Sequence, residues 1–546
     1  MRFAPLLLAA LALTTATAWP VVAAAPGGHV GGGHHEHGHP QRSEKQHEHQ
    51  PKKAANSQSG EGHHHADGHK TDRTWKSRSF PQDKIKHVVV LMLENRAFDH
   101  MCGWLGKWIP GVAGLTGNEY NVANGTRYYV NDTSPYVGAF DPDHSVKGTT
   151  LEVMGMTQRW INPEPMSGFA EHHWKKQEPH FDQVMHGFSP DRVPAISTLA
   201  KNFAVFDRYY ASLPGPTYPN RMYFLTGTSY GMTDNDIIDY LPGLPQKTIM
   251  KVLDDNNITW RNYFTDLPDM LLLKEMRTLQ NLKNLRFFDD FMKDAAAGDL
   301  PAFSWVNPRF IPTFTDPAQD QHPDHDVVLG EKVIAQLYDA LRSSPVWNHT
   351  AFVVTYDEHG GYYDHVAPPE DNVPNPDGMV APDGFNFTRL GLRVCHVVAS
   401  PWIPAGTVVH EPATAPAHRY EHQSTFQTLR HLYGFDDILT NRTMFAASYD
   451  HVFSLESPRT DAPMTLPTPS DFDKPAAYKR LAEEQSRKPP NALQRELFAV
   501  AEAAAGVAMG DITQGRHIKT QGELAVEAKK LIQRAVWDKV DGHRKP

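Results

Sequence analysis

The chain has 546 residues, enough for one large domain with appendages or for two to three smaller domains. Hydrophobic residues make up 40% and charged residues 21%, a composition typical of soluble globular proteins that excludes a collagen-like or wholly disordered chain. The 53 Lys and Arg residues are outnumbered by 63 Asp and Glu, which gives a formal charge of −10. Because this balance provides no broad basic face, we predict no nucleic-acid partner.

The first 18 residues have the pattern of a signal peptide. Arg2 supplies a positive start, an apolar run follows over residues 5–13, and an A-T-A tripeptide at residues 16–18 matches a cleavage site. A membrane anchor would need about 20 apolar residues, and we predict no transmembrane segment elsewhere. The expected location is outside the cell or along the secretory pathway.

Six N-x-[ST] sequons support the same route, since such sequons are acceptor sites in secreted glycoproteins. They begin at Asn124, Asn131, Asn257, Asn348, Asn386 and Asn441. The two cysteines, Cys102 and Cys395, exclude a disulfide scaffold and a four-cysteine zinc site. Both lie in or beside apolar runs, so we expect two buried thiols, and a single bridge is the alternative.

Residues 19–80 form a segment of a different composition, rich in Gly, Gln, Lys and His. Apolar residues almost vanish from residue 26 onwards, so the segment cannot bury enough surface to offset its ordering entropy. It holds 11 histidines, which could capture zinc, copper or nickel loosely. A solvated linker is the favoured interpretation, because the tract lacks the fixed geometry of a structural metal site.

Three apolar runs predict buried strands, at residues 85–93, 351–356 and 392–399. A segment with helical periodicity, residues 327–341, precedes the second run. Strands that alternate with helices are typical of the α/β class with a mostly parallel sheet.

Acid and amide side chains follow the first two of these strands: Glu94, Asn95, Asp357 and Glu358. In open α/β sheets, ligands bind beyond the carboxyl ends of the strands, and these hard oxygen donors suit a divalent cation. The alternative is that each pair caps the helix that follows it. Two histidines beside the second pair, His359 and His365, favour the metal site.

A stiff turn over residues 213–221 contains three prolines and a glycine. We predict a helix after it, which carries Met222. The hydroxyl of Thr217 could act as a nucleophile if a metal or base lowers its pKa, and the planar fork of Arg221 could pair with phosphate oxygens.

Several motifs together resemble the phosphoesterase family of phospholipases C, nearest to the plant-type non-specific enzymes. Bacterial phosphatidylcholine-hydrolysing phospholipases C and an acid phosphatase are more distant members. The motifs are E-N-R-A-F-D-H-M at 94–101, P-N-R at 219–221 and Y-D-E-H-G-G-Y-Y-D-H at 356–365, joined by 141–145, 322–326 and 421–422. The resemblance extends from about residue 84 to 453 and resumes at 458–461.

The resemblance implies an alkaline-phosphatase-like α/β/α sandwich and a site in which each residue has a role. Thr217 matches the nucleophile, and Glu94, Asn95, Asp357 and Glu358 match metal or active-centre positions. The histidines expected around the phosphate are His144, His322, His325 and His359. Further phosphate or substrate contacts are expected from Asn220, Arg221 and His422, although Gln423 departs from the hydroxyl residue expected after His422.

The implied activity is that of a phospholipase C, which cleaves glycerophospholipids such as phosphatidylcholine to diacylglycerol and a phosphorylated headgroup through a phosphothreonine. The implied cofactor is a divalent ion (Ca, Mg, Mn or Zn), and the implied partner is phospholipid at a membrane surface. Two alternatives are a phosphatase for soluble monoesters and a non-catalytic metal- or lipid-binding protein. Headgroup preference and oligomeric state stay open.

Residues 81–455 are expected to form the catalytic domain and residues 456–546 a connector with a helical C-terminal segment. Residues 456–490, rich in Pro, Asp and Lys, predict an extended connector. Asn491 can cap a first helix, and Thr520 with Glu523 forms a capping box for a second. We expect these helices to pack on the catalytic domain rather than on lipid, because no dense basic patch accompanies them.

Overall fold

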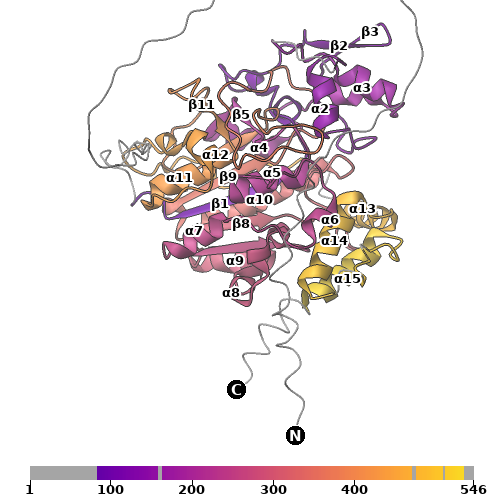
Figure 1. The fold of residues 1–546 in the computed structure, drawn as a ribbon. Helices are drawn as coiled ribbons and strands as arrows, with labels where there is room; N and C mark the ends of the chain where they lie inside the picture. Colours follow the sequence, from indigo (N-terminus) through magenta and orange to yellow (C-terminus); the bar gives the residue numbers. More distant parts are fainter. Residues whose placement is uncertain (1–82, 158–162, 470–474, 508–510, 514, 534–546) are drawn as a thin grey trace, which may run out of the picture. The chain divides into compact units, whose positions relative to one another are not determined.

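The computed structural model describes residues 83–533, apart from 158–162, 470–474, 508–510 and 514. The predicted signal peptide and the His-rich segment lie outside these residues. The centre of the fold is an eight-stranded sheet with the order β11-β4-β10-β9-β1-β8-β6-β7 (Figure 1). Its strands are β1 (His87–Leu93), β4 (Ala204–Phe206), β6 (Trp260–Phe264), β7 (Leu285–Phe287), β8 (Phe303–Asn307), β9 (Thr350–Tyr356), β10 (His396–Ala399) and β11 (Thr407–Val409).

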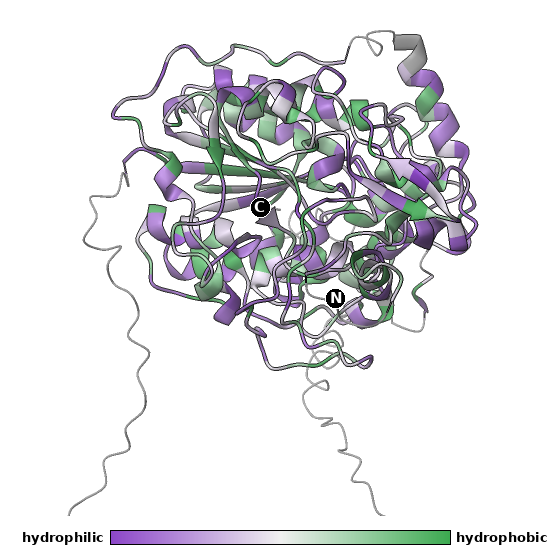
Figure 2. Cartoon of the chain, turned by 90° about the horizontal axis from the view of Figure 1, so that it is seen from above, coloured by the Kyte–Doolittle hydropathy of each residue, from purple (hydrophilic) through white to green (hydrophobic). Residues whose placement is uncertain are grey.

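The sheet is mostly parallel, which confirms the predicted α/β class. β1 lies between β8 and β9 and runs parallel to both, whereas β10 is antiparallel to its neighbours β9 and β4. Every residue of β9 is buried, so the strand is covered on both faces. Figure 2 shows these strands as hydrophobic elements enclosed by helices of mixed character. The third predicted strand was too long, because the structure has a strand only over His396–Ala399.

Helices pack around the sheet in groups that contact one another. α10 packs against α4 and α9, and α5 packs against α7 and α11. The predicted helix over 327–341 is confirmed by α10. The helices of this part of the chain are α1 (Phe98–Met101), α2 (Val146–Val153), α3 (Phe169–Lys175), α4 (Pro194–Asn202), α5 (Thr217–Thr226), α6 (Ile237–Tyr240), α7 (Ile249–Asp255), α8 (Leu279–Leu282), α9 (Phe288–Ala297), α10 (Val327–Ser343), α11 (Gln423–Tyr433) and α12 (Asn441–Phe445).

Residues 111–187, which we call the inserted segment, lie in sequence between β1 and β4 and carry a small core of their own. A hairpin of β2 (Tyr120–Ala123) and β3 (Thr126–Tyr129) packs against α3, and α3 packs against α2 (Figure 1). Apolar side chains of this segment, including Val153, Phe169 and Met185, form a cluster with Tyr363 and Leu392 that is separate from the main core. The inserted segment can therefore hold side chains rigidly at its border with the sheet.

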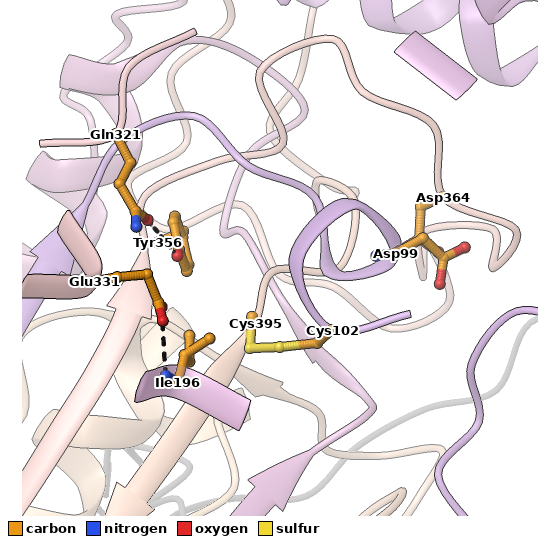
Figure 3. Close-up of a disulfide and its surroundings, with 8 residues drawn as sticks. All are labelled: Asp99, Cys102, Ile196, Gln321, Glu331, Tyr356, Asp364 and Cys395. Carbon is orange, nitrogen blue, oxygen red and sulfur yellow. Dashed lines mark hydrogen bonds between the residues drawn. A yellow bond between two sulfur atoms is a disulfide. The ribbon is translucent and has the colours of Figure 1, made fainter. Parts of the chain in front are cut away.

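The two cysteines form a disulfide rather than the expected pair of free thiols. The bond joins Cys102, just after α1, to Cys395, just before β10, with Cα atoms 6.0 Å apart. Figure 3 shows it beside Asp99, which lies on α1. Because the sequence separation is 293 residues, the bond ties the segment that follows β1 to the antiparallel part of the sheet.

Three helices form the C-terminal part of the described chain: α13 (Pro475–Arg487), α14 (Ala492–Ala504) and α15 (Gln521–Ile532). The capping boxes at Asn491 and at Thr520 with Glu523 confirm the two predicted helix starts. The expected extended connector is wrong in part, because α13 occupies its second half. α14 packs against α6 (Figure 1), as expected for helices that join the catalytic domain. None of the helices in the described residues has both the length and the apolar character that a bilayer span requires.

Candidate active site

Four predicted ligand residues meet where β1 and β9 end. These parallel strands are neighbours with Leu93 opposite Tyr356, so the residues after them are adjacent. The backbone N–H of Asn95 donates to Asp357 Oδ1 at 2.9 Å, and all four side chains are fully buried: Glu94, Asn95, Asp357 and Glu358. The helix-cap alternative is wrong, because no side chain caps α1 and the turn after Glu358 leads into no helix nearby.

Thr217 reaches the same place from a different segment. It is the first residue of α5, so residues 217–221 are helical and not part of the predicted turn. Its hydroxyl donates to Asn95 Oδ1 at 3.2 Å. The Asn220 amide donates to the carbonyls of Leu213 and Gly215 at 3.1 and 2.9 Å, which fixes the turn before α5. Asn220 therefore positions Thr217, and its phosphate contact stays a prediction.

Arg221 lies among three buried carboxylates. Its Nε donates to Asp357 Oδ2 at 3.1 Å, and its two terminal nitrogens donate to Asp269 and Glu94. Asp269, on the turn of 3-10 helix η4 (Asp269–Leu272), also accepts from the Trp305 indole at 2.9 Å. The guanidinium thus binds the acids of the site in this structure, and its predicted pairing with phosphate stays a prediction.

The carboxylates of this cluster retain oxygens without a hydrogen-bond partner in the described part of the chain. Among the described residues, Glu94 Oε2 and Glu358 Oε1 are buried carboxylate oxygens without a hydrogen-bond partner. Burial raises the pKa of Glu94 well above its ordinary value and the pKa of Asp357 to about 6, even though Arg221 acts in the opposite direction. A bound cation would offset this cost of burying charge, because buried carboxylates need a positive partner.

His144 and His322 lie at the outer side of this cluster. The half-exposed carboxylate of Asp141 lies 3.9 Å from His144 Nδ1 and 3.7 Å from His322 Nε2. Burial alone would lower the pKa of each imidazole, but nearby carboxylates raise both, those of Glu358 and Asp141 for His144 and those of Asp141 and Asp324 for His322. His144 Nε2 also lies 3.8 Å from Glu358 Oε1, so it borders the ligand set.

His325 is fixed from two sides. Its Nδ1 lies 2.6 Å from Asp320 Oδ1, and its Nε2 lies 3.5 Å from the amide nitrogen of Gln494 on α14. Gln494 also donates to the Phe310 carbonyl at 2.9 Å. The C-terminal helices therefore contribute directly to the surroundings of a predicted active-site histidine.

The last two predicted histidines have opposite charge preferences. Burial alone would lower the pKa of His359, but the carboxylates of Glu152 and Glu358 raise it to about 9. Burial lowers the pKa of His422 to about 4. Its Nε2 lies 2.7 Å from the backbone carbonyl of Asp357, which makes it a neutral donor that supports the ligand strand.

His365 belongs to a second acidic cluster instead of the first. Asp99, Asp364 and His365 are close enough together to hold a metal ion. Arg393 already donates to both acids, to Asp99 Oδ1 at 2.8 Å and to Asp364 Oδ1 at 2.9 Å. The His365 backbone and imidazole nitrogens each lie 2.7 Å from Asp99 Oδ2. A guanidinium thus supplies the positive charge that a metal would otherwise bring.

Comparison with known proteins shows the family of the chain. A family model described as the phosphoesterase family matches residues 85–436. The chain belongs to the phosphoesterase family. This phosphoesterase is a hydrolase of phosphoric ester bonds, and the family resemblance inferred from the sequence is confirmed.

Relatives of this phosphoesterase include plant and bacterial phospholipases. Non-specific phospholipase C6 of Arabidopsis thaliana is 44% identical over 395 residues, which cover 71% of this chain and 75% of the relative. Non-specific phospholipase C4 of the same plant is 40% identical, with 72% and 76% covered. Phospholipase C B of Mycobacterium tuberculosis strain H37Rv is 29% identical, with 64% and 73% covered. A solved alkaline phosphatase superfamily structure from Vibrio parahaemolyticus has a TM-score of 0.28 at 13% identity, covering 46% of this chain and 62% of its own.

Several residues of the phosphoesterase site escaped sequence reasoning. Asp324 lies within the quoted 322–326 motif and Asp320 two residues before it, so their partnership with the histidines could have been inferred from spacing. Glu152, Asp269 and Gln494 come from segments without a recognisable motif and reach the site only through the fold. No local signal in the sequence identifies them.

Proposed function

We propose that this phosphoesterase is a phospholipase C that hydrolyses glycerophospholipids such as phosphatidylcholine to diacylglycerol and a phosphorylated headgroup. The printed names of its plant relatives, at 40–44% identity, support phospholipase C activity. The observation that carries the proposal is the hydrogen bond from the Thr217 hydroxyl to Asn95, within a cluster whose carboxylates retain unpartnered oxygens. A nucleophile beside a prospective cation site is the arrangement that phosphoryl transfer requires.

The proposed ligands of a divalent ion are Glu94, Asn95, Asp357 and Glu358, with Ca, Mg, Mn and Zn as candidates. When bound, the ion would favour the Thr217 alkoxide and offset charge on the phosphate oxygens. Arg221 stays close to the same acids, held by Asp269, and adds a fixed positive charge. Together, the Arg221 guanidinium and the proposed ion would suit a site that receives a phosphodiester anion.

The chemistry begins at Thr217 Oγ, which gives its proton to one neutral imidazole as it attacks phosphorus in line. The new Oγ–P bond forms while the bond from phosphorus to the diacylglycerol oxygen breaks, and a second imidazole, present as the imidazolium, gives its proton to the leaving oxygen. This leaves the phosphorylated headgroup on Thr217 as a phosphothreonine ester. Water then attacks phosphorus and gives a proton to the second imidazole, now neutral, while the Oγ–P bond breaks and the first imidazole returns its proton to Thr217 Oγ.

His144 and His322 are the proposed proton carriers. Their side chains are 13% and 6% exposed, whereas those of His325 and His359 are 1% exposed. A group that exchanges protons with a leaving alcohol and with water must be reachable from solvent. His325 and His359 are proposed to orient the site, since each lies between fixed partners.

We further propose that the protein follows the secretory route. The disulfide supports an oxidising compartment. The acceptor residues of the sequons Asn124, Asn257, Asn348, Asn386 and Asn441 are exposed in the structure, as glycan attachment requires. Mass spectrometry of the protein from its native host would show glycopeptides at these residues and no Met1; unmodified peptides at all sequons would count against the proposal.

The decisive test of the activity is product identification. The purified protein is incubated with mixed phospholipid vesicles, with and without chelator, and lipids and soluble phosphates are analysed by mass spectrometry. We expect diacylglycerol and phosphorylated headgroups, both lost with chelator. Turnover of p-nitrophenyl phosphate without release of diacylglycerol would favour a monoesterase, and no turnover of either would contradict enzymatic function.

A further inference from the structure

The inserted segment reaches the active site from both ends of α2. His144 lies just before α2, and its Nε2 is 3.8 Å from Glu358 Oε1. Glu152 lies in the last turn of α2, and its Oε2 is 3.5 Å from His359 Nε2. The other nitrogen of that ring, Nδ1, is 3.4 Å from Glu358 Oε2. An imidazole therefore lies near each oxygen of Glu358. His144, just before α2, lies near Oε1, and His359, which contacts Glu152 of α2, lies near Oε2.

His173 completes the row from the next helix. It lies on α3, and its Nε2 is 3.1 Å from Glu152 Oε1. Carboxylate and imidazole thus alternate from Glu358 through His359 and Glu152 to His173. Glu152 and His173 are both 0% exposed, so no solvent screens these contacts.

The position of Glu152 makes a purely structural role a poor explanation. It lies next to Val153, a member of the small apolar core of the inserted segment. An apolar side chain of similar volume would pack there without the desolvation cost of a buried carboxylate. Within the part of the chain that the structure describes, the ion-pair partners of Glu152 are the imidazoles of His173 and His359, and His359 contacts Glu358 of the proposed metal site. A buried ionic contact of this kind is weak evidence for a role in stability.

We propose that Glu152 and His173 are positioning residues that hold the imidazole of His359 against Glu358, so that the inserted segment sets the orientation of this carboxylate toward a divalent cation. The inference rests on the proposed metal site. Partners that orient ligands from outside the first ring of contacts change metal affinity or activity by about 10- to 100-fold when removed. Glu152→Gln keeps the shape of the side chain and removes its charge, which makes it the primary variant.

The test compares Glu152→Gln, His173→Phe and His173→Gln in the full chain. The matched control is Glu331→Gln, another fully buried carboxylate, which contacts the start of α4 and no residue of the site. For each protein we would measure the melting temperature, the dissociation constant for Mn²⁺ by chelator competition, and kcat and KM on a short-chain phosphatidylcholine.

We expect Glu152→Gln and His173→Phe to weaken Mn²⁺ binding and lower kcat by about 10- to 100-fold, with KM within a few-fold of the wild type. His173→Gln, which retains an N–H donor for Glu152, should lie closer to the wild type. Glu331→Gln should change melting temperature only. Wild-type Mn²⁺ affinity in both Glu152→Gln and His173→Phe, or an equal loss in Glu331→Gln, would overturn the inference. If the wild type releases no diacylglycerol, the proposed phospholipase activity is wrong. The Mn²⁺ dissociation constants of the variants still test the positioning role of Glu152 and His173.

Discussion

Two buried acidic clusters lie close together in the chain, and they differ in how their oxygens are satisfied. In the first, Arg221 donates to Glu94 and Asp357, yet Glu94 Oε2 and Glu358 Oε1 accept no hydrogen bond within the described residues. The first cluster therefore retains two carboxylate oxygens that a cation could contact.

In the second cluster, every carboxylate oxygen accepts at least one hydrogen bond. Arg393 donates hydrogen bonds to Asp99 and Asp364, and backbone N–H groups donate the remaining ones. The disulfide lies beside it (Figure 3). Residue types alone do not separate the clusters, since both contain acids, an arginine and a nearby histidine. The balance of hydrogen-bond donors and acceptors does separate them. A cluster whose oxygens all accept hydrogen bonds stabilises the fold, whereas a cluster with unpartnered oxygens can still bind a cation.

The largest effect is expected from Thr217→Ala. Loss of the hydroxyl removes the nucleophile and leaves binding and electrostatics, so kcat should fall by roughly 10⁴-fold or more. Thr226→Ala is the matched control, because this buried threonine on the same helix bonds only to backbone carbonyls. Steady-state rates on phosphatidylcholine measure both. Near-normal turnover by the purified Thr217→Ala protein would remove the nucleophile assignment.

Two substitutions test directly which of the two clusters binds a metal ion. Asp357→Ala should abolish both metal content and activity, because it removes a proposed ligand. Asp364→Asn should keep the metal and lower the free energy of unfolding by about 3–5 kcal/mol, since it leaves Arg393 partly uncompensated in the core. Metal analysis and urea denaturation separate the two. An unchanged ion in Asp357→Ala, or a lost one in Asp364→Asn, would reverse the roles of the clusters.

The C-terminal helices should matter for both stability and activity. Leu493 on α14 accepts from the Tyr218 hydroxyl at 3.2 Å, and Gln494 reaches His325. We expect truncation after Leu455 to reduce melting temperature and turnover. Leu497→Ala, at a buried position of α14, should cost about 2–5 kcal/mol, whereas Val526→Ala, at an exposed position of α15, should cost little. A soluble and fully active truncated enzyme would contradict this.

The sequence was sufficient for those parts of the fold and site that follow from local pattern. The residues after β1 and β9 could be placed together because parallel neighbours end at one edge. The antiparallel direction of β10 could not be predicted, since a buried apolar run has the same pattern in a parallel and in an antiparallel strand. The helix α13 was missed because Pro475 and a charged sequence look like a connector, although proline is well tolerated in the first turn of a helix.

The assignment of His365 shows a different limit of sequence reasoning. It follows Asp357 and Glu358 closely in the chain, and proximity suggested one shared site. Two glycines with positive φ, Gly360 and Gly361, turn the chain after Glu358, and His365 then faces Asp99. Only the backbone path reveals that separation.

Glu331 offers a third buried carboxylate with a pH-dependent effect. It accepts from the backbone N–H group of Ala195 and from that of Ile196 (Figure 3), and burial raises its pKa to about 8. The unfolded chain loses this proton at lower pH than the folded one, so the contribution to stability falls as pH rises from about 4.5 to about 8. The melting temperature of the wild type, measured relative to that of Glu331→Gln, should therefore fall between pH 5 and pH 8; parallel curves across this window would refute the assignment.

Deletion of residues 26–80 should have the smallest effect. Their histidines lie outside the described residues, and the proposed cation is held by oxygen ligands elsewhere. We therefore expect unchanged kcat and unchanged chelator sensitivity in the deleted protein. A large loss of turnover would mean that the His-rich segment supplies the metal.

Anomalous diffraction from crystals soaked in Mn²⁺ tests the central distinction most directly. A peak within bonding distance of Glu94, Asn95, Asp357, Glu358 and the Thr217 hydroxyl is the predicted result. A peak between Asp99, Asp364 and His365, with none beside Thr217, would contradict it.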